Sequence, residues 1–530
     1  MRLLLINPFY PISEPPSPPL GLAFLAAALE TAGIEVRILD LVVHPYSREM
    51  LESLLNDFKP QMVGITAVTM TFDNAIKVIR DIKQIDPDIL TAMGGPHVSF
   101  CARETLTDFA ELDFIVFGEG EKTVVELIRE ANRGRNWERI NGIAFRRGAD
   151  IHYTPARELI QDLDTIPAPA RHLLALGRYR ALGMPISMTT SRGCPFKCIF
   201  CVGRKMVGAR VRYRDPVKVV DELEYLNTLG FNQINIADDL FTANKKHCLA
   251  VCDEIIGRNL KLKWTSFARV DTVSEEILTR MKSAGCTAVS FGIESANPEI
   301  LKTIKKGITL QQVADAVDIC KRVGIIPHAS FILGLPGETP ETIKETMDFG
   351  EALKKVGLSY GFHLLAPFPG TEVREHSDLF NIKILTNDWS QYHANRAIVE
   401  TPSVNRQMLD EIVIKWENEY NVYLDDIKCR IKKGQATEEE SWEVNNLERI
   451  VLTYDLMMNA VIEKVGSWKA EKNPVSETEA LATLAVRIKE CVGSKKDLVD
   501  DTLNRAVEQK NLAYLQQNGR IQWRWVDYLR

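Results

Sequence analysis

Three cysteines within eight residues are the strongest chemical feature of this 530-residue chain. Cys194, Cys198 and Cys201 lie in the segment Ser191–Cys201 with the spacing C-x3-C-x2-C. Thiolates are the ligands that iron–sulfur clusters prefer, so three of them on one short loop can hold a single cluster. Because no fourth cysteine lies close by, one iron of a [4Fe–4S] cluster would stay open to an outside ligand. The alternatives are three unrelated buried thiols or a zinc site, but zinc would need a fourth protein ligand nearby.

The spacing, with the aromatic Phe200 directly before the last cysteine, resembles the cluster motif of the radical S-adenosylmethionine (SAM) superfamily. The resemblance implies that SAM chelates the open iron through its amino and carboxylate groups. It also implies that the reduced cluster splits SAM into methionine and a 5′-deoxyadenosyl radical, which abstracts a hydrogen atom.

The length of the chain allows two or three domains, each with its own core. The composition is 45% hydrophobic and 26% charged with a net charge of −6, and this mild acidity argues against a dedicated nucleic-acid partner. No apolar run approaches the roughly 20 residues of a membrane span, and the N-terminus lacks the length and cleavage site of a signal peptide. The seven other cysteines are scattered, which predicts a reducing, cytoplasmic setting rather than a disulfide framework.

The first 150 residues alternate short apolar runs with helical patterns, which predicts an α/β domain with a doubly wound parallel sheet. The expected strands are Leu3–Ile6, Val36–Leu39, Met62–Ile65, Ile89–Met93 and Phe114–Val116. In such Rossmann-like sheets, ligands bind beyond the carboxyl ends of the strands. Loops rich in glycine and hydroxyl groups fall at those ends.

Four of these loops, in chain order, resemble the cobalamin-binding domain of cobalamin-dependent radical SAM enzymes. They are Pro15–Gly21, Thr66–Thr71, Gly94–His97 and Gly118–Glu121. The resemblance implies that they hold the corrin ring and its nucleotide tail. The contacts it implies are Pro16, Thr66, Val68, Thr69, Gly94, Gly95, His97, Gly118 and Glu119.

The histidine that binds cobalt in base-off methyltransferases, within D-x-H-x-x-G after the first strand, is absent. The corresponding loop reads Asn7-Pro8-Phe9-Tyr10. His97 is a candidate replacement, and the alternative is a loop histidine that satisfies the backbone near the ring. A Rossmann-like domain without a cofactor is a further alternative, because fold alone does not establish a ligand.

Residues 151–184 are expected to form a linker, and the βα rhythm resumes over residues 185–380. The expected strands are Pro185–Thr190, Gln233–Ala237, Lys263–Phe267, Ala288–Ile293, Pro327–Leu333 and Tyr360–Leu365. Six repeats are too few for a closed eight-stranded barrel, so we expect a partial (βα)6 barrel. Its chemistry should gather at the carboxyl ends of the strands.

Polar residues follow those strands in the order that the radical SAM family shows. Asp238 and Asp239 could take the ammonium group of bound SAM, although such a pair can also begin a helix. Arg269 is a natural partner for the SAM carboxylate. Gly292–Ser295, with Glu294 and Ser295, resembles the family's ribose motif, and Gly334 opens a loop that resembles the one bracketing the adenine, although its glycines also suit a plain tight turn.

The last region, residues 381–530, loses the βα rhythm and holds six of the eight tryptophans. We expect a helical C-terminal domain that covers the mouth of the partial barrel and shapes the substrate pocket. The alternative is that its aromatic residues fill a helical core.

Taken together, the resemblances imply a cobalamin-dependent radical SAM methyltransferase. It would move a methyl group from methylcobalamin to an unactivated carbon of a small molecule, a peptide or a lipid, with electrons from flavodoxin or ferredoxin. An oxidative cyclase like the anaerobic magnesium-protoporphyrin ester cyclase, or a carbon–carbon coupling enzyme, is the first alternative. A non-catalytic corrinoid- or SAM-binding regulator is the second. Methylthiotransferases of tRNA are disfavoured, because the first domain carries only Cys101 and not a second cysteine set.

Overall fold

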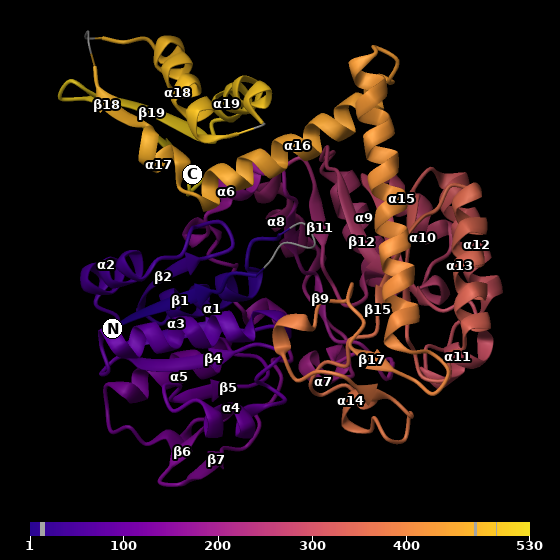
Figure 1. Cartoon of the computed structure of the whole chain (residues 1–530). Coiled ribbons are helices and arrows are strands. Elements are labelled where there is room, and N and C mark those ends of the chain that lie inside the picture. The colour runs from indigo at the N-terminus through magenta and orange to yellow at the C-terminus, as the bar shows by residue number, and fades with distance from the viewer. Residues whose placement is uncertain (11–15, 471–473, 494, 530) are drawn as a thin grey trace.

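The computed structural model describes residues 1–10, 16–470, 474–493 and 495–529. Pro15, in the first expected cobalamin loop, therefore lies outside the described residues. The N-terminal domain and the radical domain lie side by side, and the C-terminal region reaches both (Figure 1). No helix of the described ranges is both long enough and apolar enough to cross a bilayer.

The N-terminal domain is built on a seven-stranded sheet with the order β2-β1-β3-β4-β5-β6-β7. Strands β1 to β5 are parallel, as expected, while β6 and β7 extend the edge as an antiparallel hairpin. The strands are β1 (Arg2–Asn7), β2 (Glu35–Asp40), β3 (Met62–Thr66), β4 (Leu90–Gly94), β5 (Phe114–Val116), β6 (Ile143–Arg147) and β7 (Asp150–Tyr153).

Helices cover both faces of this sheet, so the prediction of a doubly wound domain is confirmed. Side chains alternate along a strand: Leu3 and Leu5 pack with one helical layer, and Leu4 and Ile6 pack with the other. The first layer is α1 (Leu20–Thr31) and α5 (Glu121–Ala131), and the second is α2 (Arg48–Phe58), α3 (Phe72–Ile85) and α4 (Ala102–Asp108).

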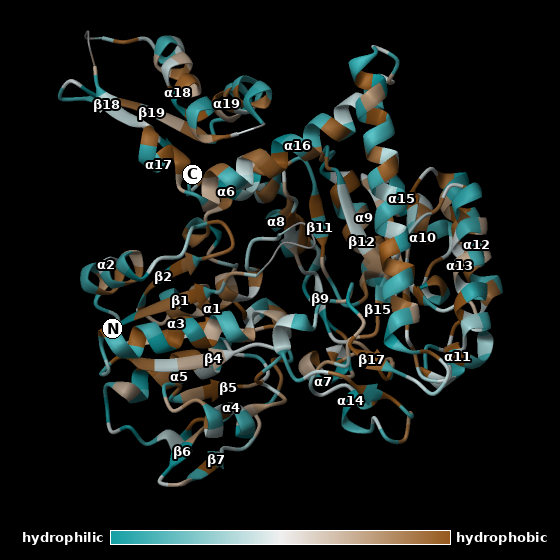
Figure 2. Cartoon of the chain, viewed as in Figure 1, coloured by the Kyte–Doolittle hydropathy of each residue, from teal (hydrophilic) through white to brown (hydrophobic). Residues whose placement is uncertain are grey.

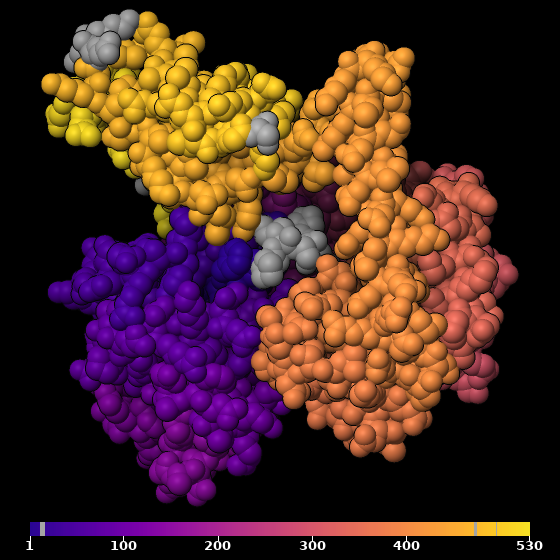
Figure 3. Space-filling model, in the orientation of Figure 1, coloured from indigo at the N-terminus to yellow at the C-terminus, as the bar shows by residue number. Residues whose placement is uncertain are grey.

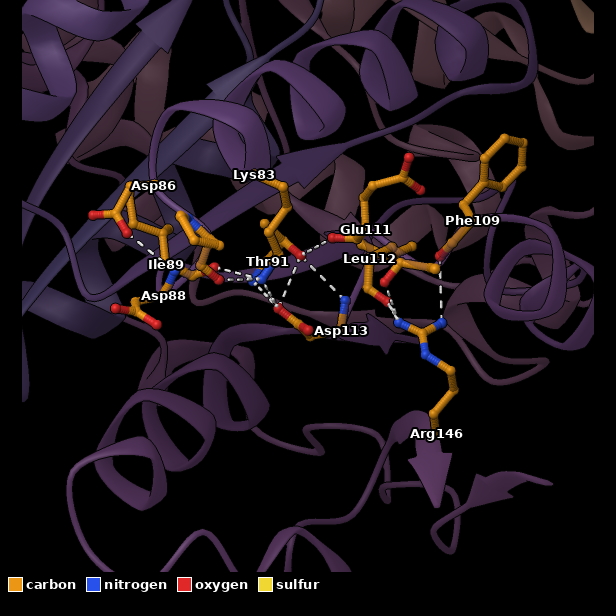
Figure 4. A network of polar contacts seen from close by, with 12 residues as sticks. Lys83, Asp86, Asp88, Ile89, Thr91, Phe109, Glu111, Leu112, Asp113 and Arg146 are labelled. Carbon is orange, nitrogen blue, oxygen red and sulfur yellow. Dashed lines mark hydrogen bonds and ion pairs between the residues drawn. The ribbon is translucent and has the colours of Figure 1, made fainter. Parts of the chain in front are cut away.

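A polar network closes the amino ends of β4 and β5, away from the ligand-binding edge (Figure 4). The Lys83 ammonium lies 2.8 Å from an Asp113 carboxylate oxygen, which also accepts the Thr91 backbone N–H at 2.8 Å. Arg146 donates to backbone carbonyls at the end of α4, including that of Leu106 at 2.7 Å. These polar groups form hydrogen bonds and ion pairs with one another, so we assign the network a role in the stability of the domain.

The radical domain contains six parallel strands in chain order, β8-β11-β12-β13-β14-β15, which is the expected partial barrel. The strands are β8 (Ile186–Met188), β11 (Ile234–Ile236), β12 (Trp264–Ala268), β13 (Cys286–Glu294), β14 (Ile326–Leu333) and β15 (Ser359–Leu364). A short antiparallel pair, β9 (Ser191–Arg192) and β10 (Arg212–Tyr213), brackets the cysteine loop.

The helices of the radical domain follow these strands, and most of them bury the outer face of the barrel. They are α7 (Gly203–Val207), α8 (Pro216–Thr228), α9 (Lys245–Gly257), α10 (Glu275–Ser283), α11 (Pro298–Thr303), α12 (Leu310–Val323), α13 (Pro340–Lys355) and α14 (Glu372–Glu375). The start of α13 shows why the sequence places a helix there. Thr339 caps it through the N–H of Thr342, and Pro340 occupies the first turn, where no N–H is needed.

The C-terminal region is helical, as expected, and adds a small antiparallel sheet. A two-stranded pair, β16 (Lys383–Ile384) and β17 (Val399–Glu400), leads to the long α15 (Arg406–Lys432) and α16 (Glu438–Met458). The remainder contains α17 (Val461–Val465), α18 (Glu477–Cys491), α19 (Val499–Glu508), β18 (Ser467–Lys469), β19 (Leu512–Gln517) and β20 (Arg520–Trp525). The sheet order is β18-β20-β19.

The two parts of this region lie in different places, and its expected role in covering the mouth of the barrel and shaping the substrate pocket stays a prediction. The helix α15 runs along the barrel beside β15, while the terminal part sits above the N-terminal domain (Figures 1 and 3). There, Trp523 and Trp525 are buried with α6 (Leu176–Ala181) and with Val42 and Val43 of the first domain. These two aromatic side chains fill a core, whereas α15 alternates apolar and polar residues on an open surface (Figure 2).

Candidate functional site

A cavity of about 630 Å³ lies between the N-terminal domain and the radical domain. Its first wall is the carboxyl edge of the N-terminal sheet, with Asn7, Thr66 and the loops that begin at Gly94 and Gly118. Its second wall comes from the radical domain and includes Ser187, Thr189, Ser191, Arg192, Met206, Val207, Ala237 and Asp239. The expected ligand edges of both sheets therefore face one shared space.

Six glycines line this cavity, at positions 21, 64, 94, 95, 118 and 120. Glycines let a backbone approach a flat ring closely. Gly95 has a φ of +105°, and a Cβ there would lie 2.6 Å from the carbonyl oxygen of Ala67. The place of the cavity at the carboxyl edge of the sheet and its glycine lining fit a large planar cofactor such as a corrin.

Gly95→Ala is expected to weaken cobalamin binding at least about tenfold. The added methyl group would meet the Ala67 backbone, and a positive φ costs a non-glycine residue about 1–2 kcal/mol. Titration of reconstituted protein with cobalamin, followed by absorbance, measures the effect. Gly33→Ala is the matched control, because Gly33 also has a positive φ but has no atom near its Cβ position and does not line the cavity. Equal losses of affinity in both variants would contradict the assignment of the loop.

His97 does not line the cavity, and neither do Val68 and Thr69. The His97 ring is buried between the rings of Phe72 and Trp389, at centroid distances of 4.3 and 4.8 Å. Burial lowers the pKa of His97 to about 4, so the ring is neutral. The structure gives His97 a packing role, and no histidine is among the described residues that line the cavity. A contact of these three residues with cobalamin stays a prediction, as does that of Pro16, which is buried just before the lining segment.

Glu119 connects the cobalamin loops to the cysteine loop. Its carboxylate lies 3.2 Å from the Arg192 guanidinium and 2.9 Å from that of Arg212, and it accepts the Ile160 N–H at 2.7 Å. Glu121 adds an ion pair to Arg192 at 2.7 Å. Arg192 lies two residues before the first cysteine. These buried pairs therefore fix the orientation of the two domains at the cavity, and Glu119 acts as a positioning residue.

The cysteine loop follows β8 and is held by two other segments of the radical domain. Ile199, inside the loop, donates its N–H to the carbonyl of Ile304 (3.2 Å) and accepts the N–H of Val373 (3.0 Å). The Cys201 sulfur accepts the N–H of Gly203 at 3.3 Å. The loop is thereby fixed from the α11 and α14 sides, with Cys201 exposed.

The three thiols fit a cluster better than a single ion. In the part of the chain that the structure describes, no three His, Cys, Asp or Glu side chains converge as the ligands of one ion would. The sulfurs that hold a cubane bind different irons and stay further apart. Burial raises the pKa of Cys201, and the nearby Cys198 and Cys194 thiols raise it further. The thiols share one environment, and iron binding would release their protons.

Asp238 and Asp239 have different roles in the structure. Asp238 is buried and accepts bonds from the Thr190 N–H, the Thr190 hydroxyl and the Ser191 hydroxyl, each at 2.6 Å. It therefore orients the chain that enters the cysteine loop, and burial raises its pKa. Asp239 lines the cavity and accepts the Gly193 N–H at 3.2 Å. Of the pair, Asp239 is the one placed to meet a ligand.

Arg269 is held in a fixed orientation beside the cysteine loop. It makes two bonds of 2.9 Å to Asp271 and one of 2.7 Å to the carbonyl of Lys306. Its guanidinium stacks 3.5 Å from the centroid of the Phe196 ring. Its predicted contact with the SAM carboxylate requires one of the remaining guanidinium N–H groups.

Lys306, which sequence reasoning missed, forms a buried ion pair with Glu294 at 2.7 Å. Its ammonium lies 6.0 Å from the centroid of the Phe200 ring. Burial raises the pKa of Cys198, and Lys306 followed by Arg269 opposes that rise. Nothing in the sequence around this loop lysine indicates that it is buried, so only the folded structure reveals the buried cation.

Glu294 and Ser295 end β13 in an unusual backbone geometry. Glu294 has a φ of +73°, and the pairing of β13 with β14 is irregular there. Strained conformations of this kind cluster at functional sites. Ser295 is buried, lies 3.3 Å from the Thr346 hydroxyl, and caps the next turn through the Asn297 N–H. Glu294 thus remains the better placed of the two for a ligand.

The predicted adenine loop is shaped by a buried carboxyl. Gly334 has a φ of +87°, and its N–H and that of Leu335 donate to Glu338 at 2.7 and 3.0 Å. The other Glu338 oxygen has no partner among the described residues. Burial raises the pKa of Glu338 to about 8.

This shift predicts that the stability of the wild type falls as the pH rises from about 4.5 to about 8. In that window the unfolded chain loses the Glu338 proton that the folded chain keeps, so unfolding becomes easier. Glu338→Gln removes the titration and is expected to flatten this slope. Melting temperatures of both proteins across the window test it, with Glu341→Gln on the exposed first turn of α13 as the control. Parallel curves for wild type and Glu338→Gln would contradict the assignment.

Comparison with known proteins agrees with both halves of the site. The model of the B12 binding domain matches residues 13–128, and that of the Radical SAM superfamily matches residues 188–350. The uncharacterised methyltransferase PH0819 of Pyrococcus horikoshii is 36% identical over 401 residues, which cover 75% of this chain and 86% of that protein. The chain belongs to the cobalamin-binding radical SAM enzymes. The cofactors of this enzyme are a [4Fe–4S] cluster, SAM and cobalamin.

Other members of this radical SAM group differ in the reaction that their names give. The anaerobic magnesium-protoporphyrin IX monomethyl ester cyclase of Rubrivivax gelatinosus is 31% identical over 434 residues, covering 78% of this chain and 76% of that protein. The solved methyltransferase TsrM of Kitasatospora setae, with cobalamin and a [4Fe–4S] cluster bound, has 25% identity and a TM-score of 0.63 over 76% of this chain and 82% of its own. The cobalamin-dependent enzyme OxsB shares the fold over 96% of this chain and 79% of its own, with a TM-score of 0.70 at 18% identity.

Proposed function

We propose that this enzyme transfers a methyl group to an unactivated carbon of its substrate. The observation that carries the proposal is the single cavity that the cobalamin loops and the entry to the cysteine loop line together. When bound, the cluster and SAM supply a hydrogen-abstracting radical, and the corrinoid supplies the methyl group. The name of the 36% identical relative, a methyltransferase, supports the same reaction.

The residues of the chain orient these groups and exclude water. The Glu119–Arg192 and Glu121–Arg192 pairs hold the two walls of the cavity together. Asp238 fixes the chain that leads to the cysteines, and Asp239 faces the shared space.

The barrel interior supports a substrate whose reacting part is uncharged. Alternate residues of the strands face inward, and in the described strands β8 and β11 to β15 the only charged residue at these positions is Glu294 at the end of β13, which is paired with Lys306. Among them, Phe267 is 54% exposed, which leaves an open aromatic surface. The uncharged polar and aromatic residues at inward positions include Ser187, Asn235, Thr265, Phe267, Ser290, His328, Ser330 and His363.

We further propose that a flavodoxin or ferredoxin supplies the electrons and that the enzyme works in the cytoplasm. All cysteines of the described chain are free, which supports a reducing compartment.

A labelled methyl group tests the proposal. The anaerobically reconstituted enzyme is incubated with reductant, cobalamin, SAM carrying a deuterated methyl group, and a panel of uncharged small molecules, peptides and lipids. We expect 5′-deoxyadenosine and a product that gains one labelled methyl group.

Two other outcomes would contradict methyl transfer. A product that loses hydrogens without gaining label would indicate oxidative ring formation, the second candidate, which the 31% identical cyclase favours. Loaded protein that binds SAM and cobalamin but forms no deoxyadenosine would indicate a binding protein.

A further inference from the structure

The chain around the cysteine loop has a strong positive bias in a protein whose net charge is −6. Residues 165–214 contain ten Lys and Arg residues and no Asp or Glu. A stretch of charged residues of one sign usually either pairs with opposite charges elsewhere in the fold or binds a partner outside the chain.

Six of the ten cations have internal partners. Five form ion pairs with carboxylates, and Arg180 donates to backbone carbonyls and to Asn511. The five are Arg171, Arg178, Arg192, Arg212 and Arg214.

The other four form a cationic rim around the cysteines: Lys197, Arg204, Lys205 and Arg210. None of them makes an ion pair with any residue that the structure describes. Arg204 donates to the Pro195 carbonyl at 2.7 Å, and Lys205 donates to the Gly370 carbonyl at 2.6 Å. These bonds hold the side chains in place without neutralising them.

The rim faces solvent. Lys197, Lys205 and Arg210 are exposed, and so is Cys201. Arg269 and Lys306, which lie over the Phe196 and Phe200 rings of the loop, are instead buried. The four rim cations are therefore available to a partner outside the chain.

We propose that the cationic rim is the docking surface for an acidic one-electron carrier protein. The inference rests on the proposed function, which requires that an electron reach a cluster held by Cys194, Cys198 and Cys201. One electron would leave the reduced carrier and enter the oxidised cluster, so the carrier is oxidised as the cluster is reduced. The net negative chain repels an acidic carrier elsewhere, while the rim attracts and orients it beside the exposed Cys201.

The geometry suits a transient contact. Electron-transfer encounters bury little surface, below about 1,200 Å², and depend on charge more than on apolar area. The rim lies where α7 and α14 approach each other, joined by the Lys205 contact, at one end of the radical domain (Figure 1).

Charge reversal tests the surface. In Lys197→Glu with Arg210→Glu, the affinity for a reduced ferredoxin at low ionic strength is expected to fall at least about tenfold. The matched control is Lys354→Glu with Lys355→Glu, in the last turn of α13, at the opposite end of the barrel strands. Affinity is measured by titration of the purified chain, and cluster reduction by electron paramagnetic resonance. The wild-type affinity should also weaken with salt, since the Debye length is about 10 Å at 0.1 M.

A small reductant separates this proposal from the proposed function. With dithionite, the rim variant should form 5′-deoxyadenosine at the wild-type rate, because a small molecule does not need the rim. If the wild type forms no 5′-deoxyadenosine with dithionite, the proposed function is wrong. The ferredoxin titration would then still test whether the rim is a docking surface.

Three results would contradict the assignment of the rim as the docking surface of the carrier. The first is an unchanged ferredoxin affinity in the rim variant, and the second is an equal loss of affinity in the control variant. The third comes from a parallel titration with single-stranded RNA: the rim variant loses RNA binding while its ferredoxin binding stays intact. Iron analysis verifies cluster loading. Arg210→Glu alone, outside the cysteine loop, should weaken ferredoxin binding in the same direction by a smaller factor.

Discussion

Replacement of Cys194, Cys198 and Cys201 together with alanine should reduce SAM cleavage by at least about 10³-fold, or about 4 kcal/mol of barrier. Without the three thiolates, no iron–sulfur cluster is held and SAM has no iron to bind. The iron content of the anaerobically reconstituted variant should fall to background. Cobalamin binding should persist, because none of the three thiols lines the cavity between the domains.

The matched control replaces Cys101, Cys429 and Cys491, which are free and lie outside the loop. This triple variant should keep its iron and its 5′-deoxyadenosine formation. Iron and sulfide analysis, a cobalamin titration and chromatography of the nucleoside products make the comparison. SAM cleavage that persists in the variant without Cys194, Cys198 and Cys201 would refute the cluster assignment.

The second large effect is expected for Lys306→Met. Lys306 and Glu294 are each only 8% exposed, and they pair at 2.7 Å. Removal of one partner leaves an uncompensated charge in the interior, which costs about 3–5 kcal/mol. We expect a clear drop in the melting temperature of the radical domain.

Two further variants make this prediction specific. Lys306→Met combined with Glu294→Gln removes both charges and should recover much of the lost stability. Lys302→Met changes an 81% exposed lysine nearby and should shift stability by no more than about 0.5 kcal/mol. A melting curve of Lys306→Met equal to that of the wild type would show that the buried pair is not needed.

Hydrophobic pattern predicted the two sheets well, because buried parallel strands are nearly continuous apolar runs. The expected strand Leu3–Ile6 lies within β1, and Pro327–Leu333 lies within β14. The hairpin β6–β7 was missed, because its edge position tolerates polar residues such as Arg146 and Arg147. The antiparallel sheet β18-β20-β19 was missed because its strands are not continuous apolar runs: the central β20 alternates exposed and buried residues.

The candidate site was predictable where chemistry depends on local spacing. Three cysteines on one loop and the glycines of the cobalamin loops are neighbours in the chain, so their spacing alone indicates what they can hold. Roles that depend on distant partners were not predictable. His97 packs against Trp389, which is distant from it in the sequence, and Lys306 finds Glu294 only once β13 and the following helix are in place.

The sequence by itself determined the cofactor chemistry, because thiolate ligands and glycine-rich turns act over a few residues. Only the tertiary structure decided which charged groups remain free. Asp238 is buried and bound to protein partners, while Asp239 faces the cavity and the cationic rim faces solvent. The reason is physical: a buried charge needs a partner, and folding alone brings one within reach.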